Sequence, residues 1–142
     1  KRMGLYDVAM IKDNHKLAAG SLSAAFEAVH LASPAVDIQV EVTTPQEALE
    51  AVAAGARFLL CDNMSVDLLR HTVEAVRGAG GAWGTGEAGG AHEPVEIEAT
   101  GGLTLEVARA YAETGVDFLS VGALTHSSPI LDVALDLVDD TS

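Results

Sequence analysis

The stretch IQVEVTTPQEALEAVAAGARFLLCD, residues 38–62, encodes a strand, a helix and a second strand in immediate succession. Its first five and last five residues are short, largely apolar runs, which predicts strands buried in a sheet. Between them, Thr44 is a suitable N-cap, Pro45 takes the first helical position, and Glu47 completes a capping box. Gly55 is a natural residue to end this helix. We therefore predict two neighbouring strands joined by a crossover helix.

The same alternation extends over the rest of the chain. A repeated pattern of helix end, Gly and Phe-Leu occurs at residues 54–59 and again, sixty residues later, at 114–119. Two strand–helix units of about thirty residues each fit that interval. Further strands are predicted at residues 7–12, 95–99 and 118–121, and further helices at residues 22–31, after Ser65, and from Thr104 to before Gly115.

Five strands that alternate with four helices predict an α/β fold with a parallel sheet. We favour a β/α barrel over a doubly wound sheet, because no Gly-x-Gly-x-x-Gly sequence follows the first strand. Five strands are too few to close a barrel, so we expect a fragment whose earlier strands lie upstream or are absent. Residues 78–92 contain seven glycines in fifteen positions and are predicted to form a flexible loop.

Composition narrows the class of protein. The chain has 142 residues, enough for one domain, with 21 acidic and 8 basic residues and a net charge of −13. This charge argues against nucleic acid and anionic membranes as partners. The chain has no apolar run of membrane-spanning length, and its single cysteine, Cys61, excludes an internal disulfide framework. We expect a cytoplasmic protein.

Charged residues lie where three successive predicted strands end. Lys12 ends the first strand, Glu41 lies near the end of the second, and Asp62 ends the third. Because the carboxyl ends of parallel strands meet at one rim, these side chains are expected to lie together. Two carboxylates and a lysine suit Mg²⁺ bound beside an anionic ligand.

Glycine-rich turns follow the last two predicted strands. Thr100-Gly101-Gly102 comes after one, and Ser120-Val121-Gly122-Ala123 closes the other. Such turns, next to a helix start, present backbone N–H groups to a phosphate. His15 and His126 follow strands and are further candidates for the rim. Cys61 is interpreted as a core residue rather than a nucleophile.

These strings resemble a known family, the quinolinate phosphoribosyltransferases, also called carboxylating nicotinate-nucleotide pyrophosphorylases. The matching segments follow one another in order from Arg2 to about Leu137. They are Arg2-Met3-Gly4-Leu5-Tyr6-Asp7, Met10-Ile11-Lys12-Asp13-Asn14-His15, Val40-Glu41-Val42, Cys61-Asp62-Asn63-Met64, Thr100-Gly101-Gly102-Leu103-Thr104 and Ser120-Val121-Gly122-Ala123-Leu124-Thr125-His126.

The resemblance implies that residues 1–142 are the later part of an incomplete, seven-stranded barrel whose N-terminal sandwich domain and first strands are absent. It implies transfer of a phosphoribosyl group from phosphoribosyl pyrophosphate to quinolinate, giving nicotinate mononucleotide, pyrophosphate and CO₂ in NAD synthesis. It also implies Mg²⁺ and a homo-oligomer, either a dimer or a hexamer of dimers. The alternatives are a related phosphoribosyltransferase for another aromatic acid, and a non-catalytic barrel fragment.

The resemblance also assigns roles to individual residues. Arg2 and Lys12 would hold the quinolinate carboxylates, while Glu41 and Asp62 would bind the ribose hydroxyls and Mg²⁺. Residues of the two glycine turns would bind the 5-phosphate, with His126 beside them: Thr100, Gly101, Gly102, Val121, Gly122 and Ala123. Three departures are Lys1 where the family usually has His, Thr100 in place of Ser, and a longer loop at 78–92. We expect the chain alone to be nearly inactive.

Overall fold

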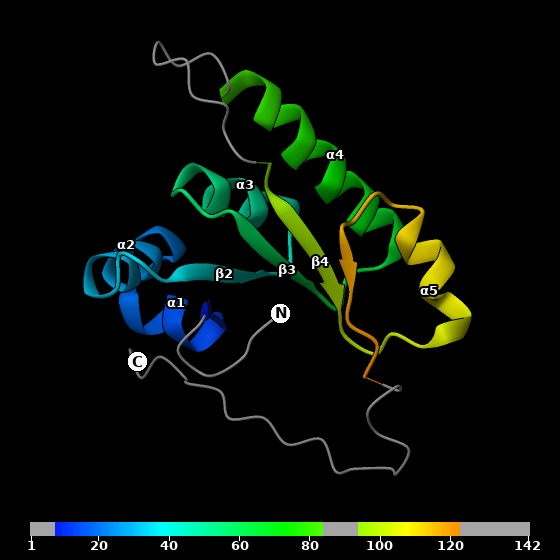
Figure 1. Cartoon of the computed structure of the whole chain (residues 1–142), viewed down its shortest axis with the longest axis horizontal. Helices are drawn as coiled ribbons and strands as arrows, with labels where there is room; N and C mark the ends of the chain where they lie inside the picture. The colour runs from blue at the N-terminus through cyan, green and yellow to red at the C-terminus, as the bar shows by residue number, and fades with distance from the viewer. Residues whose placement is uncertain (1–7, 84–93, 123–142) are drawn as a thin grey trace, which may run out of the picture.

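The computed structural model describes residues 8–83 and 94–122, in which five strands alternate with helices (Figure 1). In chain order the elements are β1 (Val8–Ile11), α1 (Asp13–Ala19), α2 (Leu22–Ala32), β2 (Asp37–Val42), α3 (Pro45–Ala53), β3 (Phe58–Asp62), α4 (Val66–Trp83), β4 (Glu96–Thr100), α5 (Leu105–Ala112) and β5 (Phe118–Leu119). All of the predicted strands are present, to within a few residues at their ends.

The strands form one sheet in the order β1-β2-β3-β4-β5, and every neighbouring pair is parallel. Each strand therefore lies beside the next strand in the chain, which is the order of a β/α barrel wall, whereas a doubly wound sheet reverses direction at its first strand. The helices flank the sheet from α2 beside β2 to α5 beside β5 (Figure 1). The prediction of an α/β fold with barrel-type strand order is confirmed.

The core lies between one face of the sheet and the helices. Strand residues in this core include Val40, Leu59 and Ile97, each of which is fully buried. Because strand side chains alternate between faces, their neighbours Gln39, Leu60 and Glu98 point to the opposite face. These three side chains are also buried, although they lie outside the helix-packed core. The sheet thus has an apolar outer face and a second, more polar inner face.

Local signals in the sequence explain how the helices begin and end. The Thr44 side chain accepts a hydrogen bond from the Glu47 N–H (3.2 Å), and the Glu47 carboxylate accepts one from the Thr43 N–H (2.7 Å). The glycines that end α3 and α5, Gly55 and Gly115, have φ of +107° and +90°. The cap and the two helix ends were predicted correctly.

Two predictions about loops were wrong. No helix is predicted between the first strand and residue 22, but residues 13–19 form α1, so His15 lies in a helix rather than in a loop. Part of the predicted loop at 78–92 is also helical, because α4 continues to Trp83. Helix elongation is cooperative, so a strong start near Ser65 carries the helix into a segment whose glycines disfavour it by only about 1 kcal/mol each. Residues 84–93 lie outside the described part.

Candidate active site

Lys12 and Glu41 form an ion pair at the carboxyl ends of β1 and β2. The Lys12 Nζ lies 3.4 Å from the Glu41 Oε2, and the two side chains are 57% and 13% exposed, respectively. Their contact follows from the register, in which Ile11 pairs with Val40, so the next residue on each strand points to the same, inner face. The predicted meeting of these two residues is confirmed. The exposed ammonium remains within reach of an anion in solution.

Lys12 is the N-cap residue of helix α1, which holds its backbone in place. The Lys12 N–H donates to the His15 Nδ1 (3.0 Å), which assigns His15 a local structural role at the start of this helix. Lys16 reaches Asp13 (2.7 Å) and Glu47 (3.2 Å), tying α1 to the start of α3. This cluster joins α1, which follows β1, to the first turn of α3, which follows β2.

The Lys16 cluster shifts the pKa values of its members. Burial works against the charge of Lys16, but its bonds to Asp13 and Glu47 outweigh that effect and raise its pKa. Burial likewise disfavours the charged form of Glu47, but the Thr43 N–H and Lys16 outweigh it, so the pKa of this carboxyl is lowered. Both shifts mean that the ion pair contributes to stability at neutral pH.

Asp62 ends β3 and has the same strand parity as Leu60, which places it on the inner face. Leu60 is the β3 partner of Glu41, and Asp62 lies two residues beyond Leu60 along β3. The two carboxylates therefore stand on adjacent strands, on one face and near one edge of the sheet. The Asp62 Oδ2 accepts a hydrogen bond from the Asn63 Nδ2 (3.0 Å).

The turn after β4 lies against the turn after β3. Gly101 and Gly102 have φ of +92° and +59°, a backbone conformation that glycine adopts without strain. A Cβ added at Gly101 would come within 2.7 Å of the Asn63 backbone nitrogen and closer still to its side chain, whereas one added at Gly102 would meet nothing within 4 Å. The Asp62 loop and the predicted phosphate turn are thus in direct contact.

A polar layer lies below the rim on the same face. The Gln39 side-chain amide donates to the Glu98 carboxylate (2.9 Å), and the Ser120 hydroxyl donates to its other oxygen. Each member precedes a predicted site residue by two positions: Gln39 precedes Glu41, Glu98 precedes Thr100, and Ser120 precedes Gly122. This layer connects β2, β4 and β5 beneath the candidate site.

Several candidates are separated from the rim or lie outside the described residues. Cys61 points into the helix-packed core, and burial raises the pKa of its thiol to about 12, so it is not poised as a nucleophile. Val121 and Gly122 are described next to β5, with open space where a Cβ on Gly122 would lie. Arg2, Ala123 and His126 lie outside the described residues.

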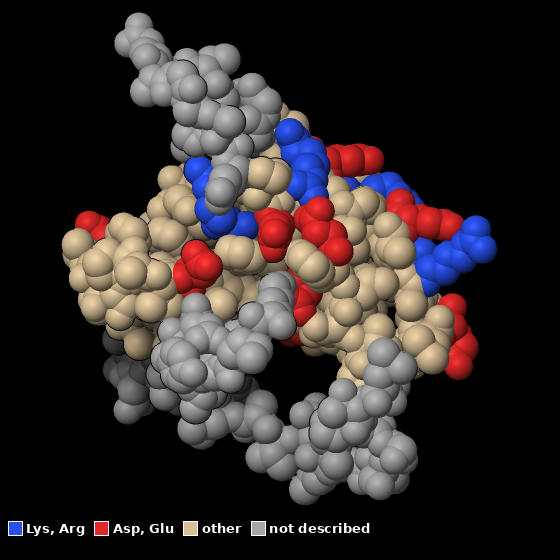
Figure 2. Space-filling model, viewed as in Figure 1, with Lys and Arg blue, Asp and Glu red and all other residues tan. Residues whose placement is uncertain are grey.

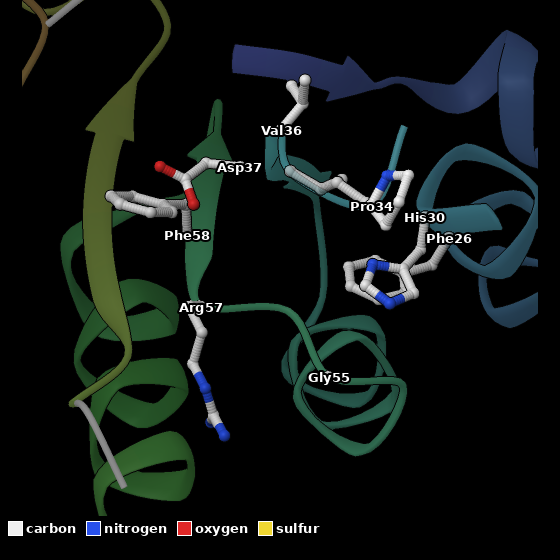
Figure 3. Close-up of a pocket in the computed structure, with 9 residues that line it drawn as sticks. Phe26, His30, Pro34, Val36, Asp37, Gly55, Arg57 and Phe58 are labelled. Carbon is white, nitrogen blue, oxygen red and sulfur yellow. The ribbon is translucent and has the colours of Figure 1, made fainter. Parts of the chain in front are cut away.

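A cavity of about 150 Å³ lies at the opposite end of the strands. Its lining includes residues from α2 and from the amino ends of β2 and β3, among them Phe26, Asp37 and Phe58. The Phe26 and His30 rings stack with centroids 6.3 Å apart, while Arg57 extends away from Asp37 (Figure 3). Ligands of β/α folds bind at the carboxyl ends of the strands, so this cavity is not the candidate site.

The charge distribution over the surface bears on how an anion could be held. On the face seen in Figure 2, basic side chains are interspersed with acidic ones and form no continuous basic surface among the described residues. No helix in the described ranges is both long and apolar enough to cross a bilayer.

Sequence reasoning missed two features of this site. Asn63 was quoted in a motif but was given no role, although a polar residue directly after a rim carboxylate could have drawn attention to it. The Gln39–Glu98–Ser120 layer was also missed. Its signal is a polar residue at every second strand position, the period at which side chains return to one face.

Comparisons with known proteins agree with this geometry. The model of the family "Quinolinate phosphoribosyl transferase, C-terminal domain" matches residues 1–136. The chain is 41% identical to the nicotinate-nucleotide pyrophosphorylase [carboxylating] of Mycobacterium leprae and 39% identical to the probable enzyme of that name from Bacillus subtilis, each over 96% of this chain. The solved nicotinate-nucleotide pyrophosphorylase of Francisella tularensis is 33% identical, with a TM-score of 0.73 over 88% of this chain.

The chain spans less than half of each of these proteins: 44% of the M. leprae relative, 42% of the B. subtilis relative and 39% of the F. tularensis chain. The expectation that it forms the later part of a longer barrel remains a prediction. The match over residues 1–136 and the shared fold nevertheless establish the family of this chain. The chain belongs to the quinolinate phosphoribosyl transferase family, and its residues 1–136 match the model of that family's C-terminal domain.

Proposed function

We propose that the rim of this sheet binds the phosphoribosyl pyrophosphate half of a carboxylating phosphoribosyl transfer to quinolinate. The observation that carries the proposal is the meeting, at one edge, of the Lys12–Glu41 pair, Asp62 and the Gly101–Gly102 turn. These groups match the parts of that substrate: carboxylates for ribose hydroxyls, backbone N–H groups for the 5-phosphate, and a cation for negative charge. Family membership supports the same assignment.

The proposed chemistry uses charge at the rim. The bond between the ribose anomeric carbon and pyrophosphate breaks, with the electron pair leaving on pyrophosphate, and the quinolinate nitrogen bonds to that carbon. Glu41 and Asp62 stabilise the positive charge that develops on the ribose. The quaternised ring then accepts the electron pair of the 2-carboxylate as CO₂ departs, and a proton takes its place on the ring.

Lys12 is suited to the acidic partner in this reaction. Its side chain is more than half exposed and its ammonium pairs with Glu41, so a substrate carboxylate can approach it from the inner face. Arg2, which lies outside the described residues, would supply the bidentate contact to the second carboxylate. Thr100 keeps the hydroxyl that the family usually places before the glycine turn.

The donor set at the rim fits Mg²⁺ bound together with substrate. In the described ranges no three acidic, His or Cys side chains form a ready-made metal site. Glu41 and Asp62, which lie on adjacent strands at one edge of the sheet, are the two carboxylates that would bind the ion. Mg²⁺ is commonly held by one or two carboxylates, with substrate phosphates and water completing its coordination. When bound, it would neutralise charge on the departing pyrophosphate. We also propose a cytoplasmic homo-oligomer, in keeping with the implied family assembly.

Titration calorimetry tests the proposal directly. Phosphoribosyl pyrophosphate should bind the chain in the presence of Mg²⁺, and more weakly in EDTA. Glu41→Gln should weaken Mg²⁺-dependent binding by at least tenfold. The matched control is Glu113→Gln, which removes a surface carboxylate paired with Arg109 on α5. Binding that is insensitive both to Mg²⁺ and to Glu41→Gln would contradict the assignment, and absence of binding would mean that this chain does not assemble the rim.

A further inference from the structure

Asn63 is the only described residue other than glycine with a positive φ, at +51°. Such a backbone conformation is uncommon, and Asn is among the residues that tolerate it best. The residue lies between Asp62 and the start of α4, in the loop at the carboxyl end of β3. Its conformation therefore determines where this loop turns, immediately beyond the rim carboxylate.

The backbone of Asn63 joins its loop to the neighbouring strand. Its N–H donates to the Thr100 carbonyl (3.1 Å), which continues the β3–β4 pairing by one bond beyond Asp62 and Thr100. Thr100 is the residue directly before the glycine turn. Through this bond, the position of the Asp62 loop and the position of the turn are fixed to one another.

The side chain of Asn63 makes a second connection between the same two segments. Its amide donates to the Asp62 carboxylate (3.0 Å), and its Cγ lies 2.6 Å from where a Cβ on Gly101 would be. The amide thus packs against the bare backbone of Gly101 on one side and orients the carboxylate on the other. Only a glycine leaves room for this arrangement.

We propose that Asn63 is a positioning residue that holds the Asp62 carboxylate and the Gly101–Gly102 turn as one rigid unit. This inference rests on the proposed function, in which Asp62 contacts the ribose and the turn contacts its 5-phosphate. Those two groups of the substrate are covalently joined, so their binding groups must keep a fixed separation. Asn63 maintains that separation because it contacts both the Asp62 carboxylate and the glycine turn, and it touches no reacting atom itself.

The decisive variant is Asn63→Gly. Glycine adopts a positive φ without strain and keeps the N–H that donates to Thr100, so this change removes only the side-chain amide. We expect affinity for phosphoribosyl pyrophosphate with Mg²⁺ to fall about tenfold, the effect of losing one hydrogen bond to a charged group. The thermal unfolding midpoint should change little. Asn63→Asp, which replaces the donor with a second negative charge beside Asp62, should weaken binding further.

A matched control separates positioning from stability. Gly115→Ala places a side chain at φ +90° on a helix end remote from the rim, so it should lower the unfolding midpoint but leave the ligand affinity within twofold. Affinity of Asn63→Gly within twofold of the unchanged chain would overturn the proposal. So would a loss of affinity in Gly115→Ala as large as that in Asn63→Gly.

A ligand-free measurement keeps this inference distinct from the proposed function. In amide NMR spectra, Asp62→Asn should shift the Gly101 and Gly102 signals, and the shift should be much smaller when Asn63 is already Gly. Equal shifts in both backgrounds would overturn the positioning role, whether or not the substrate binds. If the unchanged chain binds no phosphoribosyl pyrophosphate but shows the non-additive shifts, the proposed function fails for this chain while the coupling stands.

Discussion

The two faces of strands β2, β3 and β4 are built from alternate residues of the same short segments, yet one face is apolar and the other is largely polar. The outer face presents Val40, Leu59 and Ile97 to the helices, all fully buried in one apolar cluster. The inner face presents Gln39 and Glu98, which bond to one another, and the rim groups above them. Neighbouring residues of one strand therefore have different roles: one packs in the core that stabilises the fold, and the next faces the candidate site.

This difference predicts that the faces respond differently to substitution. Outer-face changes should alter the free energy of unfolding and leave ligand affinity unchanged in the molecules that remain folded. Substitutions at the rim should lower ligand affinity and leave the free energy of unfolding nearly unchanged. The polar layer beneath the rim should give an intermediate response, because Gln39 and Glu98 are buried like core residues but belong to the same face as the site.

The largest expected effect is on the outer face. Ile97→Ala removes a fully buried side chain from the core cluster and should lower the free energy of unfolding by about 3 kcal/mol. Urea denaturation followed by circular dichroism measures this change. The truncation of Leu31, which is 73% exposed, provides the control and should cost about 0.5 kcal/mol or less. Equal losses in the two variants would contradict the assignment of the core.

An intermediate effect is expected for the polar layer. Glu98→Ala removes the acceptor of both Gln39 and Ser120 and should cost about 2 kcal/mol, since the buried Gln39 amide and the half-buried Ser120 hydroxyl lose this acceptor. Glu98→Gln keeps one carbonyl acceptor and should lose less. The same denaturation experiment ranks the two variants. If Glu98→Ala were as stable as the unchanged chain, the layer would contribute nothing to joining β2, β4 and β5.

The smallest effect concerns the Lys16–Glu47 contact behind the rim, and it depends on pH. The pKa of Glu47 is lowered below its ordinary 4.5, so the contact stabilises the fold above that pH and its contribution is lost as pH falls through the folded-state value. The raised pKa of Lys16 places the alkaline loss above 10.5. Glu47→Gln should cost about 1 kcal/mol or less at neutral pH.

Measuring stability as a function of pH tests this prediction. The curves of Glu47→Gln and the unchanged chain should differ at neutral pH and converge in acid, below the folded-state pKa of Glu47. Glu27, which is exposed on α2, offers a matched Glu→Gln control with parallel curves. A difference that stays constant down to strongly acidic pH would show that the Glu47 charge does not contribute.

Strand–helix order could be predicted from the sequence because its signals are local. Thr44 and Glu47 mark a helix start, Gly55 and Gly115 mark helix ends, and apolar runs mark the strands. Strand order also predicts that Lys12 and Glu41 lie at one edge, since the carboxyl ends of parallel strands lie at the same edge of a sheet, and the two residues form an ion pair there.

What could not be predicted depends on contacts between segments distant in the chain. Helix α1 is short and has no buried residue, so no apolar period reveals it. The Gln39–Glu98 bond joins residues 59 positions apart across an intervening strand. The packing of Asn63 against Gly101 likewise requires the register of β3 and β4, which no local pattern encodes.

The most direct test of the central claim uses the glycine amides as reporters in a titration followed by ¹H–¹⁵N NMR. With phosphoribosyl pyrophosphate and Mg²⁺, the account predicts shifts concentrated at Gly101, Gly102 and Gly122, with Gly20 and Gly115 unchanged. A response centred instead on Gly55, which lines the cavity at the amino ends of the strands, would contradict the placement of the site at the polar rim.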